Sequence, residues 1–185
     1  IAMCEGDDYW VDPLKLQKQV DFMEHHPQHS VCFHAHFIEK KDGIREEVYR
    51  YSDYNELCPT KDVIFGGGGY MATNSMLFRS NIVTKDYPLW AIKAPVGDMP
   101  LMLILLNSGC VGYLNEIMSV YRINLSGSWS TSMAKNYKKL ASHKNRIKEM
   151  WISFNRYSNY KYRFYVLQNI LNNRWEFIKL VVKGW

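Results

Sequence analysis

The sequence predicts an α/β fold, because short apolar runs of strand character alternate along it with segments of helical periodicity. The apolar residues 1–4 precede an acidic segment, which is followed by Asp12 and Pro13, residue types that begin a helix. Farther along, an apolar helix over 101–106 leads into a strand over 111–123. We therefore expect a mixed sheet with flanking helices.

Three carboxylates, those of Glu5, Asp7 and Asp8, follow the first apolar run. A buried strand over 1–4 is expected to deliver them to the carboxyl edge of the sheet, where open α/β folds bind ligands. Because crowded carboxylates repel one another, one interpretation is a site for a hard divalent cation. The alternative is an acidic loop that only caps the next helix. That helix has the following residues at helical spacing: Leu14, Gln17, Val20 and either Met23 or Glu24.

A cluster of histidines follows that helix. His25 and His26 come just before Pro27 and suit the carboxyl end of a helix by charge and hydrogen bonding. His34 and His36 share one face of a strand expected over 31–38, which a turn joins to a second strand over 44–51. Zinc needs three or four convergent ligands, so structural roles are the favoured interpretation.

Composition and cysteine usage describe one compact chain. The 185 residues are 47% hydrophobic and 15% aromatic, which is enough for the core of one domain. Four cysteines, with no CxxC spacing, predict reduced thiols and a cytoplasmic location. No apolar run of membrane-spanning length occurs in these residues, so any membrane association is expected to be peripheral, on the inner face.

Charge divides the chain near residue 130. Residues 130–185 carry twelve Lys and Arg against two acids, a net charge of +10, whereas residues 1–129 carry eleven against sixteen, a net charge of −5. The basic, aromatic extension over 131–185 is expected to be helical, and it suits an anionic membrane surface. An amphipathic helical pair packed on the domain is the alternative. No nucleic-acid-binding motif accompanies the charge, so nucleic acid is not an expected partner.

A resemblance narrows the interpretation of the acidic segment. The stretch CEGDDYWVDPLKLQKQVDFMEHHPQHSVCFH, residues 4–34, resembles the metal-binding segment of the family 2 glycosyltransferases of GT-A fold, particularly bacterial enzymes of surface-polysaccharide synthesis. The similarity continues in order to about residue 130. It implies that residues 1–130 form the metal- and acceptor-binding, C-terminal part of a Rossmann-like GT-A domain. Carried over, Asp7 and Asp8 hold Mn²⁺ or Mg²⁺, and Glu5 and Asp7 contact a nucleotide-sugar such as a UDP- or dTDP-sugar.

A second segment carries the expected catalytic residue. GDMPLMLILLNSGCVGYLNEIMSVYR, residues 97–122, is similar to the family segment in which an Asp is the general base of an inverting transfer, and this resemblance assigns Asp98. The residue pattern alone also explains Asp98 as a helix N-cap. Both roles use a carboxylate that the helix amides hold ionised.

The resemblance also assigns substrate contacts. After the glycines at 66–69, which lack a phosphate-loop pattern and predict a turn, the residues expected near the sugars are Thr73, Asn74 and Ser75. Their alternative is an ordinary strand on a solvated face. Arg122 is expected at the diphosphate, with a surface ion pair as its alternative, and Trp129 in a Gly- and Ser-rich loop that closes over the donor. Asn124 stands near the place where family members often have a metal-binding His.

Together these features imply a metal-assisted, inverting glycosyltransferase that moves a sugar from a nucleotide-sugar to a bacterial glycan or lipid-linked acceptor. The alternative is a non-catalytic carbohydrate-binding or scaffold relative. In the family, the strands that hold the base and ribose of the donor come before the acidic motif. We therefore expect the 185 residues alone neither to bind nucleotide tightly nor to turn over.

Overall fold

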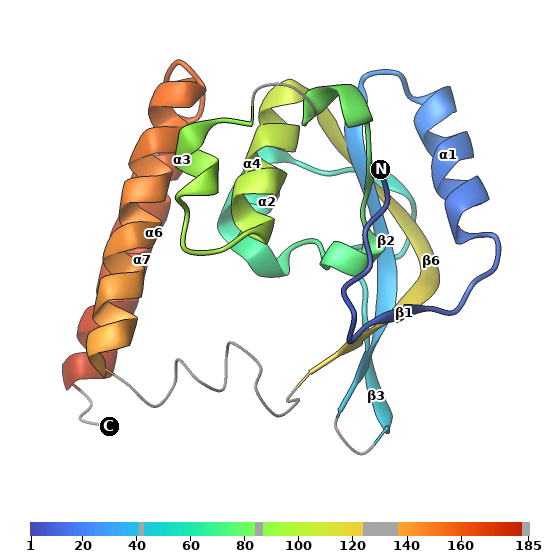
Figure 1. The fold of residues 1–185 in the computed structure, drawn as a ribbon, viewed down its shortest axis with the longest axis horizontal. Coiled ribbons are helices and arrows are strands. Elements are labelled where there is room, and N and C mark those ends of the chain that lie inside the picture. The colour runs from blue at the N-terminus through green and yellow to red at the C-terminus, as the bar shows by residue number, and fades with distance from the viewer. Residues whose placement is uncertain (41–42, 84–86, 124–136, 183–185) are drawn as a thin grey trace.

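The computed structural model describes residues 1–40, 43–83, 87–123 and 137–182, except the side chains at 46–47, 68, 137–140 and 173–182. It is an α/β structure, as the sequence predicts: a mixed six-stranded sheet lies between helices (Figure 1). The strands are β1 (Tyr9–Trp10), β2 (His29–Glu39), β3 (Arg45–Tyr49), β4 (Glu56–Leu57), β5 (Leu77–Phe78) and β6 (Cys110–Arg122).

Two long strands form the centre of the sheet. The main strand order is β1-β6-β2-β3, with β4 also paired to β6 and β5 to β2. β2 and β6 run parallel, and every other pairing between named strands is antiparallel. β2 and β3 form the predicted hairpin, and β6 matches the strand expected over 111–123 closely. Because β2 and β6 end at the same edge, that edge is the carboxyl edge at which ligands bind in such sheets.

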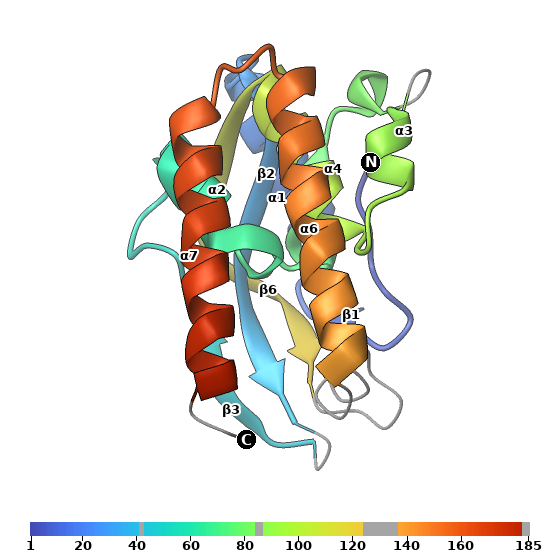
Figure 2. The same cartoon turned by 90° about the vertical axis from the view of Figure 1, so that its left-hand side faces the viewer.

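Helices cover both faces of the sheet (Figure 1). They are α1 (Lys15–His25), α2 (Thr60–Gly66), α3 (Leu89–Ile92), α4 (Asp98–Ser108), α6 (Tyr137–Tyr157) and α7 (Arg163–Val182), together with short 3₁₀ turns η1 (Gly67–Gly69), η2 (Thr73–Ser75) and η3 (Ser80–Ile82). α1 lies on one face, and α2 and α4 lie on the other. α6 and α7 pack side by side outside α2 and α4 (Figure 2). None of the helices in the described ranges combines the length and apolar character that a membrane span requires.

The C-terminal helical pair shares the core of the domain. Trp151 and Phe154 of α6, and Val166 of α7, are buried in the same apolar cluster as residues of β2 and α4. Side chains 101–106 of α4 are all buried, because the sheet covers one side of this helix and α6 covers the other. The tail is therefore helical, as expected, and packs on the domain.

The first expected strand is not a strand. Residues 1–4 make only one isolated bridge, between Ala2 and Leu77, and Ile1 remains 50% exposed. The main chain of Ile1 also exchanges hydrogen bonds with Phe78. This segment lies beside the two-residue strand β5, so little backbone is available for pairing and its side chains are only partly covered.

Helix α1 buries a polar face. Asp12 accepts a hydrogen bond from the amide of Leu14 at 2.8 Å, so the expected start signal is present. However, Leu14 and Val20 are exposed, whereas Lys15 and Gln19 are almost completely buried. Lys15 Nζ donates to Gln19 Oε1 at 2.7 Å, and Gln19 Nε2 donates to the carbonyl of Ser75 at 2.8 Å. This contact with η2 decides which face of the helix points inward.

The histidines have structural positions. His34 and His36 on β2 are buried, and His36 stacks on Tyr49 of β3 at 5.0 Å between ring centroids. Nδ1 of His25 lies 2.7 Å from the carbonyl oxygen of Asp21 at the end of α1. Among the described residues, the histidines join no group of side chains that could hold a metal. All four cysteines are free thiols, as their spacing predicts.

Candidate active site

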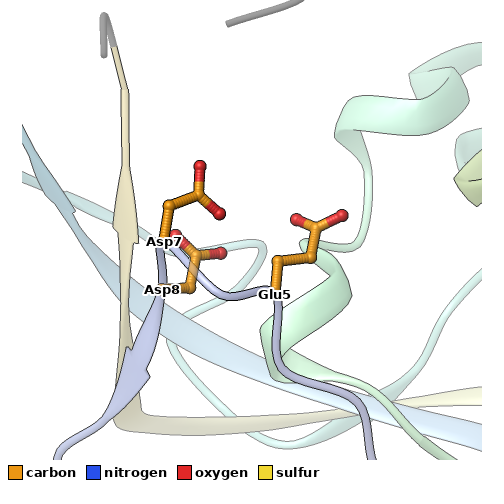
Figure 3. A group of neighbouring side chains, drawn as sticks. All are labelled: Glu5, Asp7 and Asp8. Carbon is orange, nitrogen blue, oxygen red and sulfur yellow. The ribbon is translucent and has the colours of Figure 1, made fainter. Parts of the chain in front are cut away.

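The acidic segment lies at the carboxyl edge of the sheet. β1 pairs with β6 in the register Tyr9 to Val120, so the residues just before β1 lie beside the end of β6. One carboxylate oxygen from each of Glu5, Asp7 and Asp8 lies within 4.8 Å of the others, and the three side chains point to the same side of the loop (Figure 3). The predicted location is thus correct, although a loop and not a buried strand reaches it.

Arg122, the last residue of β6, holds this loop in place. Its backbone amide donates to Asp8 Oδ1 at 2.8 Å. Its guanidinium Nε donates to the backbone carbonyl of Asp7. This hydrogen bond keeps the positive charge of Arg122 beside the three acids. Tyr9 adds a link to β2, since its hydroxyl donates to Glu39 Oε2 at 2.7 Å.

The electrostatics of the cluster favour a cation. Burial raises the pKa of Asp8 to about 6; the charges of Asp7 and Glu5 add to the rise, and the hydrogen bond from Arg122 opposes it. The pKa of Glu5 is also raised, first by partial burial and then by the charges of Asp7 and Asp98. Asp8 Oδ2 is buried without a hydrogen-bond partner in the described part of the chain. An unpaired carboxylate oxygen between two other acids fits a divalent metal.

Asp98 is the first residue of α4. Gly97, and not Asp98, is the N-cap, so the predicted cap position is wrong by one residue. Asp98 Oδ1 still accepts the backbone N–H of Met99 at 2.8 Å. The helix begins there because Gly97 precedes it and Pro100 suits its first turn. The side chain is only half-buried. Two cavities are each lined in part by Asp98.

The first cavity joins Asp98 to the acidic loop. It has a volume of about 380 Å³ and is lined by both Glu5 and Asp98. Thr73 also lines it, as the resemblance implied for a sugar contact. The remaining lining is mainly apolar or aromatic: Met3, Met76, Phe78, Val83, Tyr87, Gly97 and Leu101. A bound molecule in this cavity would contact a member of the acidic cluster and Asp98 together.

The second cavity lies on the side of Asp98 that faces the C-terminal helices. It has a volume of about 470 Å³. Glycines of α2 and η1 form part of its wall, and α6 contributes His143, Lys144 and Trp151. Gly67 has a φ of +60°, a backbone conformation that favours glycine, and a Cβ added at Gly69 would meet no atom within 4 Å. The tail is thus part of the site region.

Two of the expected sugar contacts are not accessible in this structure. Asn74 and Ser75 form a buried 3₁₀ turn rather than an exposed strand. Asn74 Nδ2 donates to the carbonyl of Val120 at 2.9 Å, and Ser75 Oγ donates to the carbonyl of Ala72 at 2.7 Å. These bonds tie η2 to β6 and leave only Thr73 at the cavity. Trp129 and Asn124 lie outside the described residues.

Several lining residues escaped the sequence reasoning. Tyr87, His143, Lys144 and Trp151 belong to no motif, and they reach the cavities only through packing of distant segments. The basic and aromatic character of the tail was visible in the sequence. That character gave no sign that α6 would form a wall beside Asp98.

Comparison with known proteins leaves the function open. No family model matches the chain. It is 34% identical over 135 residues to the uncharacterized protein Mb1547 of Mycobacterium bovis and, equally, to the uncharacterized protein Rv1520 of Mycobacterium tuberculosis. The match covers 71% of this chain, and the chain spans about 37% of the length of these relatives. Their names describe no activity, so the site geometry carries the functional argument.

Replacing Asp8 by Asn is expected to weaken Mn²⁺ binding by at least about tenfold, because it neutralises one of three clustered carboxylates. The Mn²⁺ affinity is measured by electron paramagnetic resonance of the free ion. The variant should also lose the rise in melting temperature that Mn²⁺ causes in the parent chain. The exposed Asp53, which lies outside the cluster, supplies the control Asp53→Asn. Equal Mn²⁺ affinity in Asp8→Asn and the parent chain would contradict the site.

Proposed function

We propose that the chain belongs to a metal-assisted inverting glycosyltransferase, which moves a sugar from a nucleotide-sugar to a glycan or lipid-linked acceptor. The observation that carries the proposal is the first cavity, because it places Asp98 and the acidic loop around one space. A group that accepts a proton and a group that binds a diphosphate through a cation are the two parts that a single displacement requires.

The residues have distinct roles in this reaction. Asp98 accepts the proton of an acceptor hydroxyl while that oxygen bonds to the anomeric carbon of the donor. The bond from this carbon to the diphosphate breaks in the same step, so the configuration inverts. Glu5, Asp7 and Asp8 would hold Mn²⁺ or Mg²⁺, which when bound neutralises the charge of the leaving nucleoside diphosphate. The guanidinium of Arg122 adds a positive charge at the same edge.

The two cavities suggest separate positions for the two substrates. The donor, a UDP- or dTDP-sugar, lies with its sugar in the first cavity, next to Thr73. The acceptor enters through the second cavity, between the glycines of η1 and α6. Asp98 lines both spaces, so it can contact the acceptor hydroxyl. Four free thiols agree with a reducing compartment, and we place this reaction in the cytoplasm.

A non-catalytic carbohydrate-binding or scaffold protein is the second candidate. The hydrogen bond from the Met99 amide to Asp98 favours it, because a local contact in the first turn of α4 gives this carboxylate a structural role. In that case the first cavity binds a sugar without turnover. The same arrangement of residues then predicts binding of a glycan and no release of nucleoside diphosphate.

The test is a donor panel applied to the longest natural form of the protein. UDP- and dTDP-sugars are incubated with Mn²⁺ and candidate glycans, nucleoside diphosphate release is measured, and NMR determines the anomeric configuration of the product. We expect Mn²⁺-dependent release and an inverted linkage. A retained configuration, or release that ignores chelation of the metal, contradicts the proposal. Glycan binding without release from any donor supports the second candidate.

A further inference from the structure

Helix α7 is apolar on two opposite faces. Its inner face packs against α2 and α6, with Val166 and Asn169 buried. Its outer face carries Phe164, Leu167 and Leu171, which are 73%, 57% and 55% exposed. These residues follow one another at spacings of three and four, so they form one stripe along the helix. We call these three residues the outer stripe.

By helical spacing, the outer stripe lies on the side of α7 opposite the buried Val166 and Asn169. In Figure 2, α6 and α7 lie in front of the sheet. In the described part of the chain, no element covers the outer stripe. An exposed apolar stripe on a helix normally contacts an apolar partner.

The surroundings of the outer stripe are basic and aromatic. Residues 150–175 contain no Asp or Glu. Exposed cations, Lys161 and Arg163, lie at the start of the helix, and the exposed rings of Tyr157 and Tyr160 lie at the preceding turn. Cations with Tyr and Phe at the edge of an apolar stripe are the composition that binds the headgroup region of an anionic bilayer.

The structure excludes some aromatic residues of the extension over 131–185 from this role. Trp151, Phe154 and Tyr162 contribute to the aromatic character of the tail, yet all three are buried in the core. They cannot reach a lipid surface while the domain is folded. Any membrane contact of the tail must use the other aromatic residues, and Phe164 is the most exposed large apolar side chain in the described residues.

We propose that the outer stripe and its flanking cations, Lys161 and Arg163, bind the surface of an anionic lipid bilayer, with α7 lying along that surface. A second copy of the chain is a poorer partner, because it presents the same excess of positive charge. An anionic bilayer offers an apolar interior for the outer stripe and negatively charged headgroups for Lys161 and Arg163. This inference goes beyond the proposed function, since it concerns neither the acidic loop nor Asp98.

The test is co-sedimentation of the chain with vesicles of phosphatidylglycerol and phosphatidylcholine, compared with phosphatidylcholine alone. The double variant Phe164→Ser, Leu167→Ser is expected to reduce binding at least about tenfold, because it removes most of the apolar contact. The matched control is Leu14→Ser, Leu16→Ser on α1, whose side chains are also exposed and which should bind like the parent chain. Circular dichroism establishes that each variant is folded.

Charge variants separate the electrostatic part. Lys161→Gln, Arg163→Gln should weaken binding at low salt and change it little at high salt. Binding that ignores phosphatidylglycerol, or an equal loss in the α1 control, overturns the proposal. A parent dimer that the outer-stripe variant converts to monomer in analytical ultracentrifugation, with vesicle binding unchanged, also overturns it and assigns the stripe to self-association. No outcome depends on donor, metal or transfer activity.

Discussion

Replacement of Asp98 by Asn is expected to lower the transfer rate about 10²-fold or more while leaving the fold intact. Asparagine keeps an oxygen that can accept the amide hydrogen of Met99, so the start of α4 is preserved. It cannot take a proton from the acceptor hydroxyl. A base role and a cap role therefore predict opposite kinetic results for the same variant.

Steady-state kinetics of the longest natural form of the protein provide the measurement, with kcat and KM determined separately. The expected loss lies in kcat, since the acceptor still binds. Asp62→Asn is the matched control, because Asp62 also lies in the first turn of a helix, α2, and lines neither described cavity. Normal kcat in Asp98→Asn, with unchanged melting temperature, would leave Asp98 as a cap and favour the binding protein.

The stability of the fold is expected to fall steeply below pH 6.5. Burial lowers the pKa of His34 to about 3 and that of His36 to about 4, from an ordinary value of 6.5. In that range the unfolded chain binds protons that the folded chain excludes, so stability is lost as the pH falls. Each histidine removes about 3 kcal/mol of unfolding free energy between pH 6.5 and 4.

Asp8 acts in the opposite sense. Its pKa is raised to about 6, so the folded state takes up its proton first and gains stability as the pH falls toward 3.8. The unfolding free energy lost through the two histidines exceeds the amount gained through Asp8. The folded state therefore becomes less stable overall as the pH falls. Total stabilities of small domains are about 5–15 kcal/mol, so the net loss is expected to be a substantial fraction of the unfolding free energy, with the chain still folded at pH 4.

Urea denaturation at a series of pH values measures this loss. His34→Gln should reduce the slope of unfolding free energy against pH, while the control His25→Gln on the exposed end of α1 should retain it. Where His34→Gln is too unstable to study, the slope of the parent chain still gives the protons taken up on unfolding. A parent stability that stays constant from pH 6.5 to pH 4 would contradict neutral, buried histidines.

Local patterns predicted the longer helices and strands correctly. β6, α4 and the β2–β3 hairpin are close to their expected positions, because alternation, capping residues and turn residues act over a few neighbouring positions. The pattern failed in part for α1, whose inward face carries Lys15 and Gln19 beside the expected Met23, whereas Val20 is exposed. Hydrogen bonds with η2, about sixty residues away, override that pattern, and no local rule includes them.

By itself, the sequence determined the alternation of strands and helices, the acidic segment, the helix start at Asp98 and the basic tail. These features depend on short-range chemistry, which neighbouring residues specify. Only the tertiary structure decided that Glu5 and Asp98 share a cavity, that Asn74 and Ser75 are buried, and that α6 forms a wall beside Asp98. Those outcomes require packing between segments far apart in the chain, because burial depends on what covers a residue and not on its own type.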